Sequence, residues 1–494
     1  MPSNNPKQLG QFFTPRPFAR FMTSFISPMS NTAPILEPCC GEGVFIEELL
    51  KLDYRNVLGY EIDDNIEIRT PNYVECCSFL SVPIKPQYEL IIGNPPYVRF
   101  RHLPAEAKQE LQESKLWNEF FNSLCDYLYI FILQAVEMLK DGGQLIFVTP
   151  SYWLSTTHSE PLRNYLIERG GFETICMLYE TPVFKKVASS IMVFKYVKGR
   201  QFEKIRISEY DSNKLTLTEP SDTYDIPQFA KDRRWTVAKL EIQSLLSDYE
   251  DRCTTTLGKI CDIGNGMVTG LDKAFQIPNG VTLNTKEKRA ILAVIKGKHL
   301  NRFQHRHITP YIFLPDDLTE KQFRADYPTF DALLEPYRDR LSKRYQYGRK
   351  IEYWEWVFLR NHNLFSSDRS RIFVPGKERI SHKSFFRFAY IEPNIYPTQD
   401  VTGIVPKKNC RMDIYFILAI LNSKEVFNWV KYNGIVKGRV VEFSEKPLSI
   451  IPIREANAEE SQDIVSLCRK CCHDNTDGRI HLLQDAVNNF LVAR

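Results

Sequence analysis

Four consecutive residues, Asn94-Pro95-Pro96-Tyr97, place an amide, a rigid backbone and an aromatic ring directly after an apolar run. The prolines fix φ and contribute no backbone N–H. The Asn94 side-chain oxygen and the Pro95 carbonyl can accept the two N–H groups of a planar amine, while Tyr97 can stack on the ring that carries it. This order of residue types favours methyl transfer to an exocyclic or amide nitrogen, by positioning and electrostatic stabilisation and without an ionised base.

A structural alternative for the same tetrapeptide is a Pro-Pro turn after a buried strand, with Tyr97 as packing. The upstream pattern favours the chemical interpretation. An apolar run at 34–37 leads into a glycine loop at 38–43, and 44–50 has helical spacing. Strand, glycine loop and helix form a typical nucleotide-cofactor arrangement, and an acid, Glu61, ends the next apolar run about 20 residues later.

With these motifs in this order, the chain resembles the gamma-class N6-adenine DNA methyltransferases of the TaqI/Eco57I type. The family's opening Phe-x-Thr-Pro segment stands here within residues 11–17, and a later core strand at 142–150 is also similar. The resemblance implies an α/β fold: a Rossmann-like S-adenosylmethionine-dependent methyltransferase domain followed by a mixed α+β DNA target-recognition domain. We expect a parallel sheet covered by helices, among them a helix from Asp126 to Leu139.

The resemblance also implies roles for individual residues. Thr14 would lie near the methionine end of S-adenosylmethionine, Glu61 would hold its ribose, and Ile62 would lie against its adenine. Phe184 matches an aromatic residue that packs the flipped target adenine. The complete set of expected site residues is catalytic Asn94, Pro95 and Tyr97; cofactor-binding Thr14, Glu37, Cys39, Gly41, Gly43, Glu61, Ile62, Ser78, Phe79 and Asn94; and substrate-binding Tyr97 and Phe184.

One position departs from the family pattern. The family usually carries Asp-Phe-Leu where this chain has Ser78-Phe79-Leu80. A serine hydroxyl can accept a hydrogen bond from the adenine amino group, but it carries no charge. We therefore expect weaker cofactor binding or compensation by a neighbour, with Phe79 still able to stack on the adenine.

The two halves of the chain differ in charge. The 494 residues carry a formal net charge of +4, but residues 1–250 hold 26 Lys and Arg against 32 Asp and Glu, whereas residues 251–494 hold 38 against 28. A polyanion should bind to the second half. No apolar run reaches the roughly 18 residues of a transmembrane helix, and no signal peptide begins the chain, so we expect a cytoplasmic protein.

The twelve cysteines do not form a disulfide pattern and are expected to be reduced. Pro38-Cys39 resembles the nucleophile dipeptide of cytosine-C5 methyltransferases, but its place in the glycine loop argues against that role. Cys468, Cys471, Cys472 and His473 have metal-like spacing without a second paired set, so we expect no metal and a surface helix from Glu459 to Cys472.

We expect two domains: the methyltransferase domain at 1–245 and the target-recognition domain at 246–494. Weaker resemblances to recognition domains occur in order at 264–275, 295–303, 414–430 and 450–453. Basic and aromatic residues interleave at 340–350 and 382–388, and further basic residues lie at 437–439. Such stretches can neutralise phosphates, although each single residue is more often a solvated charge or a core ring.

The predicted function is transfer of a methyl group from S-adenosylmethionine to N6 of a flipped adenine in double-stranded DNA, within a restriction–modification system. Three alternatives stay open: an RNA methyltransferase, a protein-glutamine N-methyltransferase, and a catalytically weak DNA-binding subunit, which Ser78 permits. No nuclease motif is apparent, so any restriction endonuclease partner should be a separately encoded protein.

Overall fold

The computed structural model describes residues 13–179, 190–210, 217, 219–314, 318–345, 348, 350–380, 383–437 and 440–492. The chain divides into two compact units, and the boundary falls between Gln243 and Ser244, within helix α7 (Leu240–Arg252). We describe each unit by itself. The expected roles of residues 1–245 and 246–494 stay predictions.

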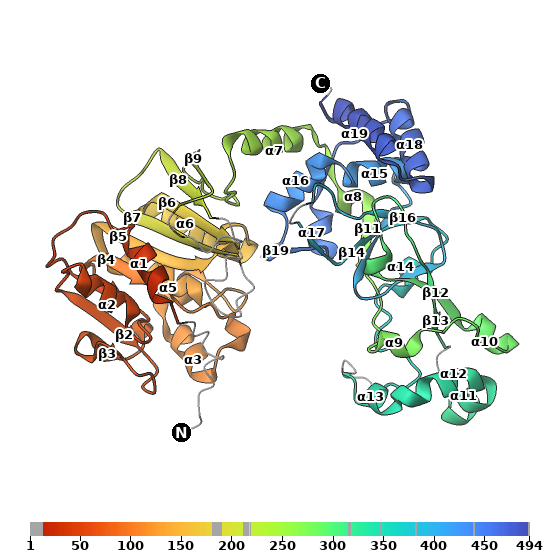
Figure 1. Ribbon diagram of the computed structural model, residues 1–494, viewed down its shortest axis with the longest axis horizontal. Helices are drawn as coiled ribbons and strands as arrows, with labels where there is room; N and C mark the ends of the chain where they lie inside the picture. Colours follow the sequence, from red (N-terminus) through yellow and green to blue (C-terminus); the bar gives the residue numbers. More distant parts are fainter. Residues whose placement is uncertain are drawn as a thin grey trace. The chain divides into compact units, whose positions relative to one another are not determined.

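Unit 1 is built on one nine-stranded sheet with the order β3-β2-β1-β4-β5-β7-β6-β8-β9 (Figure 1). β1, β2, β3, β4 and β5 pair in parallel, whereas β7 runs antiparallel to both β5 and β6. The strands are β1 (Ile35–Glu37), β2 (Val57–Glu61), β3 (Val74–Cys76), β4 (Tyr88–Gly93), β5 (Leu139–Pro150), β6 (Gly170–Tyr179), β7 (Ile191–Lys198), β8 (Lys204–Glu209) and β9 (Asp222–Pro227).

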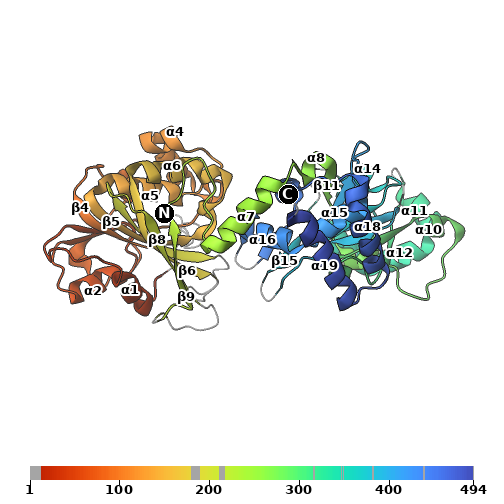
Figure 2. The ribbon, with the colours of Figure 1, turned by 90° about the horizontal axis from the view of Figure 1, so that it is seen from above.

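Helices cover both faces of this sheet (Figure 2). Successive strand residues point to opposite faces, so Ile91 packs into the core beneath α5 while Leu90 and Ile92 join the core beneath α1 and α2. Almost every residue of α5 is buried, because this helix lies between the sheet and other helices. The helices are α1 (Arg16–Thr23), α2 (Val44–Lys51), α3 (Ala105–Glu113), α4 (Lys115–Phe120), α5 (Leu128–Met138) and α6 (Glu160–Arg169).

This architecture confirms the predicted fold class. The predicted strand at 34–37 is β1, the helical spacing at 44–50 is α2, and the run ending at Tyr60 is β2, which includes Glu61. The helix expected from Asp126 begins two residues later, at Leu128, because the Asp126 side chain accepts the Leu128 backbone N–H at 3.1 Å.

Unit 2 combines small sheets with many short helices. Its sheets have the orders β10-β21, β11-β18-β14-β16, β13-β12-β17 and β15-β20-β19. The strands are β10 (Thr255–Thr256), β11 (Cys261–Asn265), β12 (Ile291–Ile295), β13 (Thr309–Ile312), β14 (Arg371–Pro375), β15 (Lys377–Arg379), β16 (Ala389–Ile391), β17 (Ile395–Pro397), β18 (Val401–Pro406), β19 (Val436–Lys437), β20 (Val440–Glu442) and β21 (Pro452–Ile453).

The helices of unit 2 surround these sheets, and the two longest, α18 and α19, end the chain. Beyond α7 they are α8 (Leu257–Ile260), α9 (Asp272–Phe275), α10 (Thr285–Arg289), α11 (Glu320–Asp326), α12 (Pro328–Leu334), α13 (Arg338–Ser342), α14 (His362–Phe365), α15 (Ile414–Leu421), α16 (Lys424–Asn433), α17 (Glu445–Ser449), α18 (Ala458–His473) and α19 (Asp477–Val492). None of the helices in the described part of the chain is long and apolar enough to cross a bilayer.

Candidate active site

The carboxyl ends of three parallel strands bring the predicted site residues together. β1 ends at Glu37, β2 ends at Glu61, and Asn94 directly follows β4. The strand order reverses at β1, since β2 and β3 lie on one side of it and β4 and β5 on the other. Such a reversal opens a ligand crevice at the carboxyl ends of the strands, which is where these three side chains lie.

The glycine loop between β1 and α2 is closed by backbone hydrogen bonds. Cys40 donates to the Tyr60 carbonyl at 2.9 Å, and the Gly41 N–H donates to Glu61 Oε2 at 2.8 Å. Gly43 has φ +83°, and a Cβ there would lie 2.7 Å from Thr70 Oγ1. The loop therefore needs glycine at this position, both for its backbone conformation and for its close approach to Thr70.

Glu61 is buried, and backbone N–H groups hold both of its carboxylate oxygens. Oε2 accepts from Gly41, and Oε1 accepts from the Asp63 N–H at 3.0 Å. Each oxygen keeps a further lone pair. The carboxylate is thus fixed in position and still able to accept the two hydroxyl groups of a ribose.

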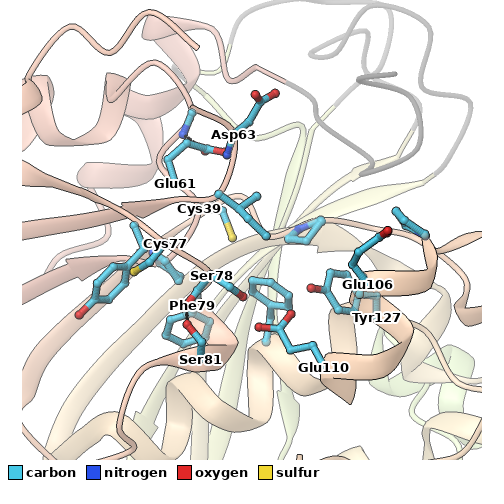
Figure 3. Close-up of a pocket in the computed structure, with 18 of the residues that line it drawn as sticks. Cys39, Glu61, Asp63, Cys77, Ser78, Phe79, Ser81, Glu106, Glu110 and Tyr127 are labelled. Atoms are coloured by element: carbon cyan, nitrogen blue, oxygen red, sulfur yellow. Dashed lines mark hydrogen bonds between the residues drawn. The ribbon is translucent and has the colours of Figure 1, made fainter. Parts of the chain in front are cut away.

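A cavity of about 810 Å³ lies beside this loop (Figure 3). Its volume falls within the usual range for sites that hold a cofactor-sized ligand. Seven of the ten predicted cofactor residues line it: Cys39, Gly41, Glu61, Ile62, Ser78, Phe79 and Asn94.

A second, water-sized cavity of about 30 Å³ is lined by Thr14 and Glu37 together with Cys39 and Gly41. Glu37 is 1% exposed, and its Oε2 has no hydrogen-bond partner among the described residues. Burial, opposed by a hydrogen bond from the Ile46 backbone, raises the pKa of this carboxyl well above its usual range. A buried carboxyl oxygen without a partner is a ready acceptor for a positively charged group. Gly43 lines neither cavity, and its contribution is the shape of the loop.

Aromatic rings form the end of the large cavity beneath Ser78. The Phe79 ring is 2% exposed and lies 5.5 Å from the Phe131 ring and 6.4 Å from the Tyr60 ring, measured between centroids. Ser78 Oγ accepts the Leu80 backbone N–H at 3.2 Å and so caps the 3-10 turn Phe79–Ser81. The serine that replaces the family's usual aspartate therefore has a local structural bond as well as a place on the cavity wall.

The Asn-Pro-Pro-Tyr corner lies at the cavity wall with its residues in different surroundings. Asn94 and Pro96 line the cavity, whereas Pro95 is buried and the half-buried Tyr97 packs against the core. Asn94 Nδ2 donates to Thr14 Oγ1 at 3.3 Å, which ties the Phe-x-Thr-Pro segment to the corner.

The Tyr97 hydroxyl is hydrogen-bonded to the Asn94 side-chain oxygen. It donates to Asn94 Oδ1 and lies 3.2 Å from the Val148 carbonyl oxygen, a second acceptor. Burial raises the pKa of Tyr97, so the hydroxyl stays protonated and remains a donor. An amine would therefore share Asn94 Oδ1 with this hydroxyl, or replace it there.

Several cavity residues carried no signal in the sequence. Glu106 and Glu110 project from α3 toward the cavity, and Tyr127 lies beside them (Figure 3). Asp63 and Asp64 follow directly after two predicted residues, so a wider window around Glu61 could have found them. Helix α3 belongs to no motif, and nothing in its pattern indicates that it borders a ligand site. Phe184, expected at the target base, lies outside the described residues.

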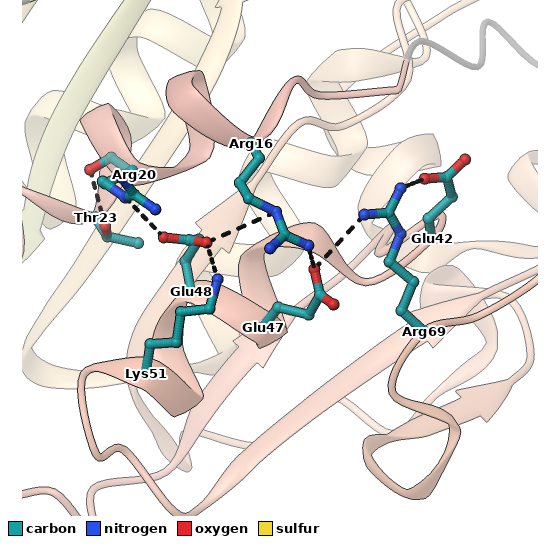
Figure 4. A network of polar contacts seen from close by, with 8 residues as sticks. All are labelled: Arg16, Arg20, Thr23, Glu42, Glu47, Glu48, Lys51 and Arg69. Carbon is teal, nitrogen blue, oxygen red and sulfur yellow. Dashed lines mark hydrogen bonds and ion pairs between the residues drawn. The ribbon is translucent and has the colours of Figure 1, made fainter.

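An ionic network fastens α1 to α2 at the back of the glycine loop (Figure 4). Arg16 of α1 pairs with Glu47 of α2, and Arg69 pairs with Glu42 and lies 3.7 Å from Glu47. Buried Glu48 accepts from Arg20 at 3.1 Å. Through Arg16, Glu47 is connected to the segment that carries Thr14. Through Arg69, it is connected to the segment that follows the cavity residues 62–66.

The predicted basic stretches of unit 2 contain two kinds of basic residue. Some bind other groups of unit 2, and others are exposed. Arg344 donates to the carbonyls of Thr269 and Glu352 at 2.8 and 2.9 Å, so it joins backbone segments. Arg387 pairs with Glu378, whose side chain has no exposed area, at 2.5 Å. Exposed charges remain in the first stretch at Arg340, Lys343 and Lys350. Residues 438 and 439 of the third stretch lie outside the described residues.

Another basic segment of unit 2, which we call the basic hairpin (residues 296–307), was not singled out from the sequence for its charge. Its arms are joined by a bridge between Leu300 and His305 and by the Arg306 N–H, which donates to the His299 carbonyl at 2.9 Å. Lys298 and Arg306 are exposed, and neither has an ion-pair partner among the described residues. The His307 ring is exposed beside that of His299, with 5.0 Å between centroids.

The cysteines with metal-like spacing lie on α18. Cys468 and Cys471 are buried on the inner face of this helix. Burial raises the pKa of the Cys471 thiol to about 11. Within the described residues, no group of three or more His, Cys, Asp or Glu side chains is arranged to hold a metal ion.

The residues of unit 1 fit S-adenosylmethionine. Glu61 offers fixed acceptors for the ribose, aromatic rings border the cavity next to Ser78, and the unpartnered oxygen of Glu37 suits the ammonium group of the methionine. Gly41, which lines both cavities, has no side chain to keep a ligand away from the backbone. These features lie in one crevice, and Asn94 lies on its wall.

The chain is similar in sequence to known methyltransferases. Residues 45–184 match the family model of the Eco57I restriction-modification methylase. The chain is 43% identical over 488 residues to the type II methyltransferase M.HindII of Haemophilus influenzae, with 94% of the chain and 93% of that protein covered. It is also 43% identical to M.HincII of Haemophilus influenzae, with the same coverage.

The fold of the solved type IIL restriction-modification enzyme MmeI, determined in complex with DNA, is similar with a TM-score of 0.63. That similarity covers 96% of this chain and 70% of MmeI at 13% identity, which indicates a common fold. The sequence relatives go further, because high identity extends across both units. The chain therefore belongs to the Eco57I-type restriction–modification methylases, as an S-adenosylmethionine-dependent type II methyltransferase.

Proposed function

We propose that this protein transfers the methyl group of S-adenosylmethionine to N6 of an adenine that has flipped out of double-stranded DNA. The observation that carries this proposal is the position of Asn94, at the end of β4 on the wall of the cofactor cavity. An acceptor at this place holds a planar amine beside the methyl donor, where proximity and orientation lower the barrier.

When bound, S-adenosylmethionine supplies a methyl group on a positively charged sulfur. Asn94 Oδ1 accepts one N–H of the target amine, and the Pro95 carbonyl accepts the other. These two acceptors direct the nitrogen lone pair toward the methyl carbon and stabilise the positive charge that develops on nitrogen. Bound beside these acceptors, S-adenosylmethionine would donate the methyl group to the nitrogen, its sulfur would keep the electron pair of the broken S–C bond, and one amine proton would pass to solvent.

Tyr97 has two positions in this mechanism. Without a base, its hydroxyl occupies Asn94 Oδ1. When the base enters, the ring moves out and stacks on it, which frees the acceptor for the amine. The enzyme thereby exchanges one hydrogen bond to Asn94 for another, and part of the cost of flipping is offset by stacking.

A thiol-based attack at a ring carbon is disfavoured. Cys39, the cysteine nearest in pattern to such a nucleophile, lies in the glycine loop, and burial raises its pKa well above its ordinary value. A neutral thiol is a poor nucleophile. This favours an amine target over cytosine C5. Among amine targets, adenine N6 follows from the resemblance of the motifs around Asn94 and Thr14.

We propose that unit 2 supplies the DNA contacts, with the basic hairpin at the phosphates. Exposed cations without an acidic partner attract a polyanion, and each phosphate that they neutralise releases counterions. The membership in a restriction–modification family supports DNA over the RNA and protein-glutamine alternatives. A separately encoded restriction endonuclease that cuts unmethylated sites is the partner we propose.

Incubation of the protein with methyl-labelled S-adenosylmethionine and a mixed-sequence duplex tests the assignment. Mass spectrometry of the nucleosides from the digested DNA should find N6-methyl-2′-deoxyadenosine. Sequencing of the product should show that the modified adenine occurs in one recognition sequence. A product of N4-methylcytosine or 5-methylcytosine would contradict the choice of base. Label in total RNA or in a glutamine-containing protein, but not in DNA, would contradict the substrate.

A titration with S-adenosylmethionine alone separates an active enzyme from a weak DNA-binding subunit. We expect saturable binding to the isolated protein, despite Ser78. Duplex binding without measurable cofactor binding would favour the weak subunit.

A further inference from the structure

The large cavity of unit 1 is lined by acids and by no base. Of its lining residues, all within the described part of the chain, none is Lys, Arg or His. Six carboxylates line it: Glu61, Asp63, Asp64, Glu106, Glu110 and Glu113. A concave site with charges of one sign concentrates their field inside, so this cavity is an environment for a cation.

Helix α3 contributes half of these acids from one face. Glu106, Glu110 and Glu113 follow one another at spacings of four and three residues, which places them along one side of the helix. An adjacent side anchors α3, because Ala107 and Leu111 are buried in the core, and Ala107 also borders the cavity. The acidic face is therefore held toward the cavity by packing and not by ion pairs.

The carboxylates of Glu106 and Glu110 do not stabilise the fold through a bond to a described partner. Neither forms a hydrogen bond or an ion pair with any described residue, whereas Glu113 accepts from Gln109 at 2.9 Å. Burial raises the pKa of the Tyr127 phenol, and the charge of nearby Glu110 raises it further. Figure 3 shows both carboxylates on the α3 side of the cavity, opposite Cys77 and Ser78.

The neighbouring small cavity is also lined by an acid. Glu37 lines it with a carboxyl oxygen that has no hydrogen-bond partner among the described residues. The two cavities share Phe13, Cys39 and Gly41 among their lining residues, so they lie next to each other. An independent, fully buried group therefore points to the same kind of ligand as α3 does.

We propose that Glu106 and Glu110 make the site select the cationic cofactor over its demethylated product. S-adenosylmethionine carries a net charge of +1 because of its sulfonium, whereas S-adenosylhomocysteine, a thioether, is neutral overall. The α3 carboxylates attract the first and have no net charge to attract in the second. Loss of the sulfonium charge in each turnover thus weakens the hold on the product and favours its replacement by fresh cofactor.

The selection depends on the cofactor alone and not on which base is methylated. It also acts at a distance, because partly exposed carboxylates attract a cation across the cavity without touching it. In such surroundings one charge contributes about two- to fivefold to a binding constant. For two carboxylates, we expect a preference of about tenfold that salt weakens.

Calorimetric titration of the full-length protein with each of the two compounds tests this proposal. In the E106Q/E110Q variant, the ratio of the two affinities should fall about three- to tenfold, through weaker binding of S-adenosylmethionine, with S-adenosylhomocysteine bound equally well or better. Raising the salt concentration should lower the ratio in the unmodified protein and change it little in the variant. The E106D/E110D variant, which keeps both charges, should retain the ratio.

The matched control is E119Q, which removes an exposed charge from the neighbouring helix α4 outside the cavity. It should leave the ratio unchanged. An unchanged ratio in E106Q/E110Q would overturn the proposal, and so would equal weakening of both compounds, which would assign the two residues a structural role. If the double variant folds poorly, the E110Q variant tests the same proposal. Its expected change in the logarithm of the affinity ratio is half as large.

Discussion

The two units of the chain carry opposite charges where each is expected to meet its ligand. In unit 1, the cavity is lined by six carboxylates and no described base, whereas in unit 2 the basic hairpin exposes Lys298 and Arg306 without acidic partners. We therefore expect a small cation to bind to unit 1 and a long polyanion to bind to unit 2. The modest net charge of +4 conceals this division, because the two fields nearly cancel in the sum.

In the proposed mechanism, electrostatics sorts the ligands, while the chemical step uses neutral groups. Asn94, Pro95 and Tyr97 carry no charge between them, and the pKa of Tyr97 is raised by burial. A neutral amide can hold an amine next to a sulfonium without forming an ion pair to either. Variants of the three regions should therefore have separable effects.

The largest effect is expected from Asn94→Ala. Removal of this acceptor should lower the rate of methyl transfer by about 100-fold or more, as loss of one positioned hydrogen-bonding group does in other enzymes. Single-turnover transfer to duplex DNA measures this rate. Cofactor and DNA affinities, measured separately, should change only a few-fold. Transfer at an undiminished rate would remove Asn94 from the mechanism.

The next effect concerns the basic hairpin. The K298A/R306A variant should bind duplex DNA roughly tenfold or more weakly, and the slope of log K against log salt should fall by about two. Fluorescence anisotropy across a salt series measures both quantities. Affinity for S-adenosylmethionine should stay the same.

A matched control for the hairpin is K408A/K470A, which removes two exposed lysines of unit 2 that lack ion-pair partners among the described residues. If this variant loses as much DNA affinity as K298A/R306A, the hairpin has no special role and only the total charge of unit 2 matters.

A pH dependence should distinguish the buried acid of unit 1 from the exposed acids. Because burial raises the pKa of Glu37, its carboxyl is protonated in the free protein at pH values above its ordinary range. A bound cation favours the ionised form, so the pKa falls on binding and a proton is released. Affinity for S-adenosylmethionine should then rise with pH, by up to about tenfold per unit, until pH exceeds the raised pKa.

Calorimetry in two buffers of different ionisation enthalpy counts the protons released. The E37Q variant should bind the cofactor more weakly and without this release, whereas E106Q/E110Q should keep it. Release of the same number of protons by E37Q would assign them to another group.

The smallest effect is expected from Glu47→Gln, at the centre of the network behind the glycine loop. Its partners Arg16 and Arg69 are 41% and 44% exposed, so solvent screens the pairs. The loss should be about 1 kcal/mol of stability at most, or about 2–4 °C in the melting temperature of unit 1. Scanning calorimetry should find this difference at low salt and not at 1 M salt. An equal loss at both salt concentrations would indicate packing as its cause.

Local patterns revealed the elements that position the site. β1, the loop at 38–43 and α2 are contiguous, and a short apolar run followed by helical spacing is visible in a short window. The roles of Glu61 and Thr14 came instead from the family resemblance, since spacing alone is weak for such short motifs. The structure places both residues at the two adjoining cavities, where their roles stay proposals.

Other features could not be read from local patterns. The Tyr97 hydroxyl meets Asn94 three residues away only because the corner folds back on itself. Ser78 was treated as a substitution within a motif, but its hydroxyl also caps a 3-10 turn. In the stretch 382–388, Arg387 is bound to the buried Glu378, a partner nine residues away.

The amino-acid order alone determined the methyltransferase class and the parallel part of the sheet, because the glycine loop and the Asn-Pro-Pro-Tyr corner are each built from neighbours along the chain. Only the tertiary structure decided that α3 turns Glu106 and Glu110 toward the cofactor cavity, and that residues 296–307 form an exposed basic hairpin. Both depend on which side of an element is buried by distant residues. Charge acts through space, so its meaning depends on packing that no short segment encodes.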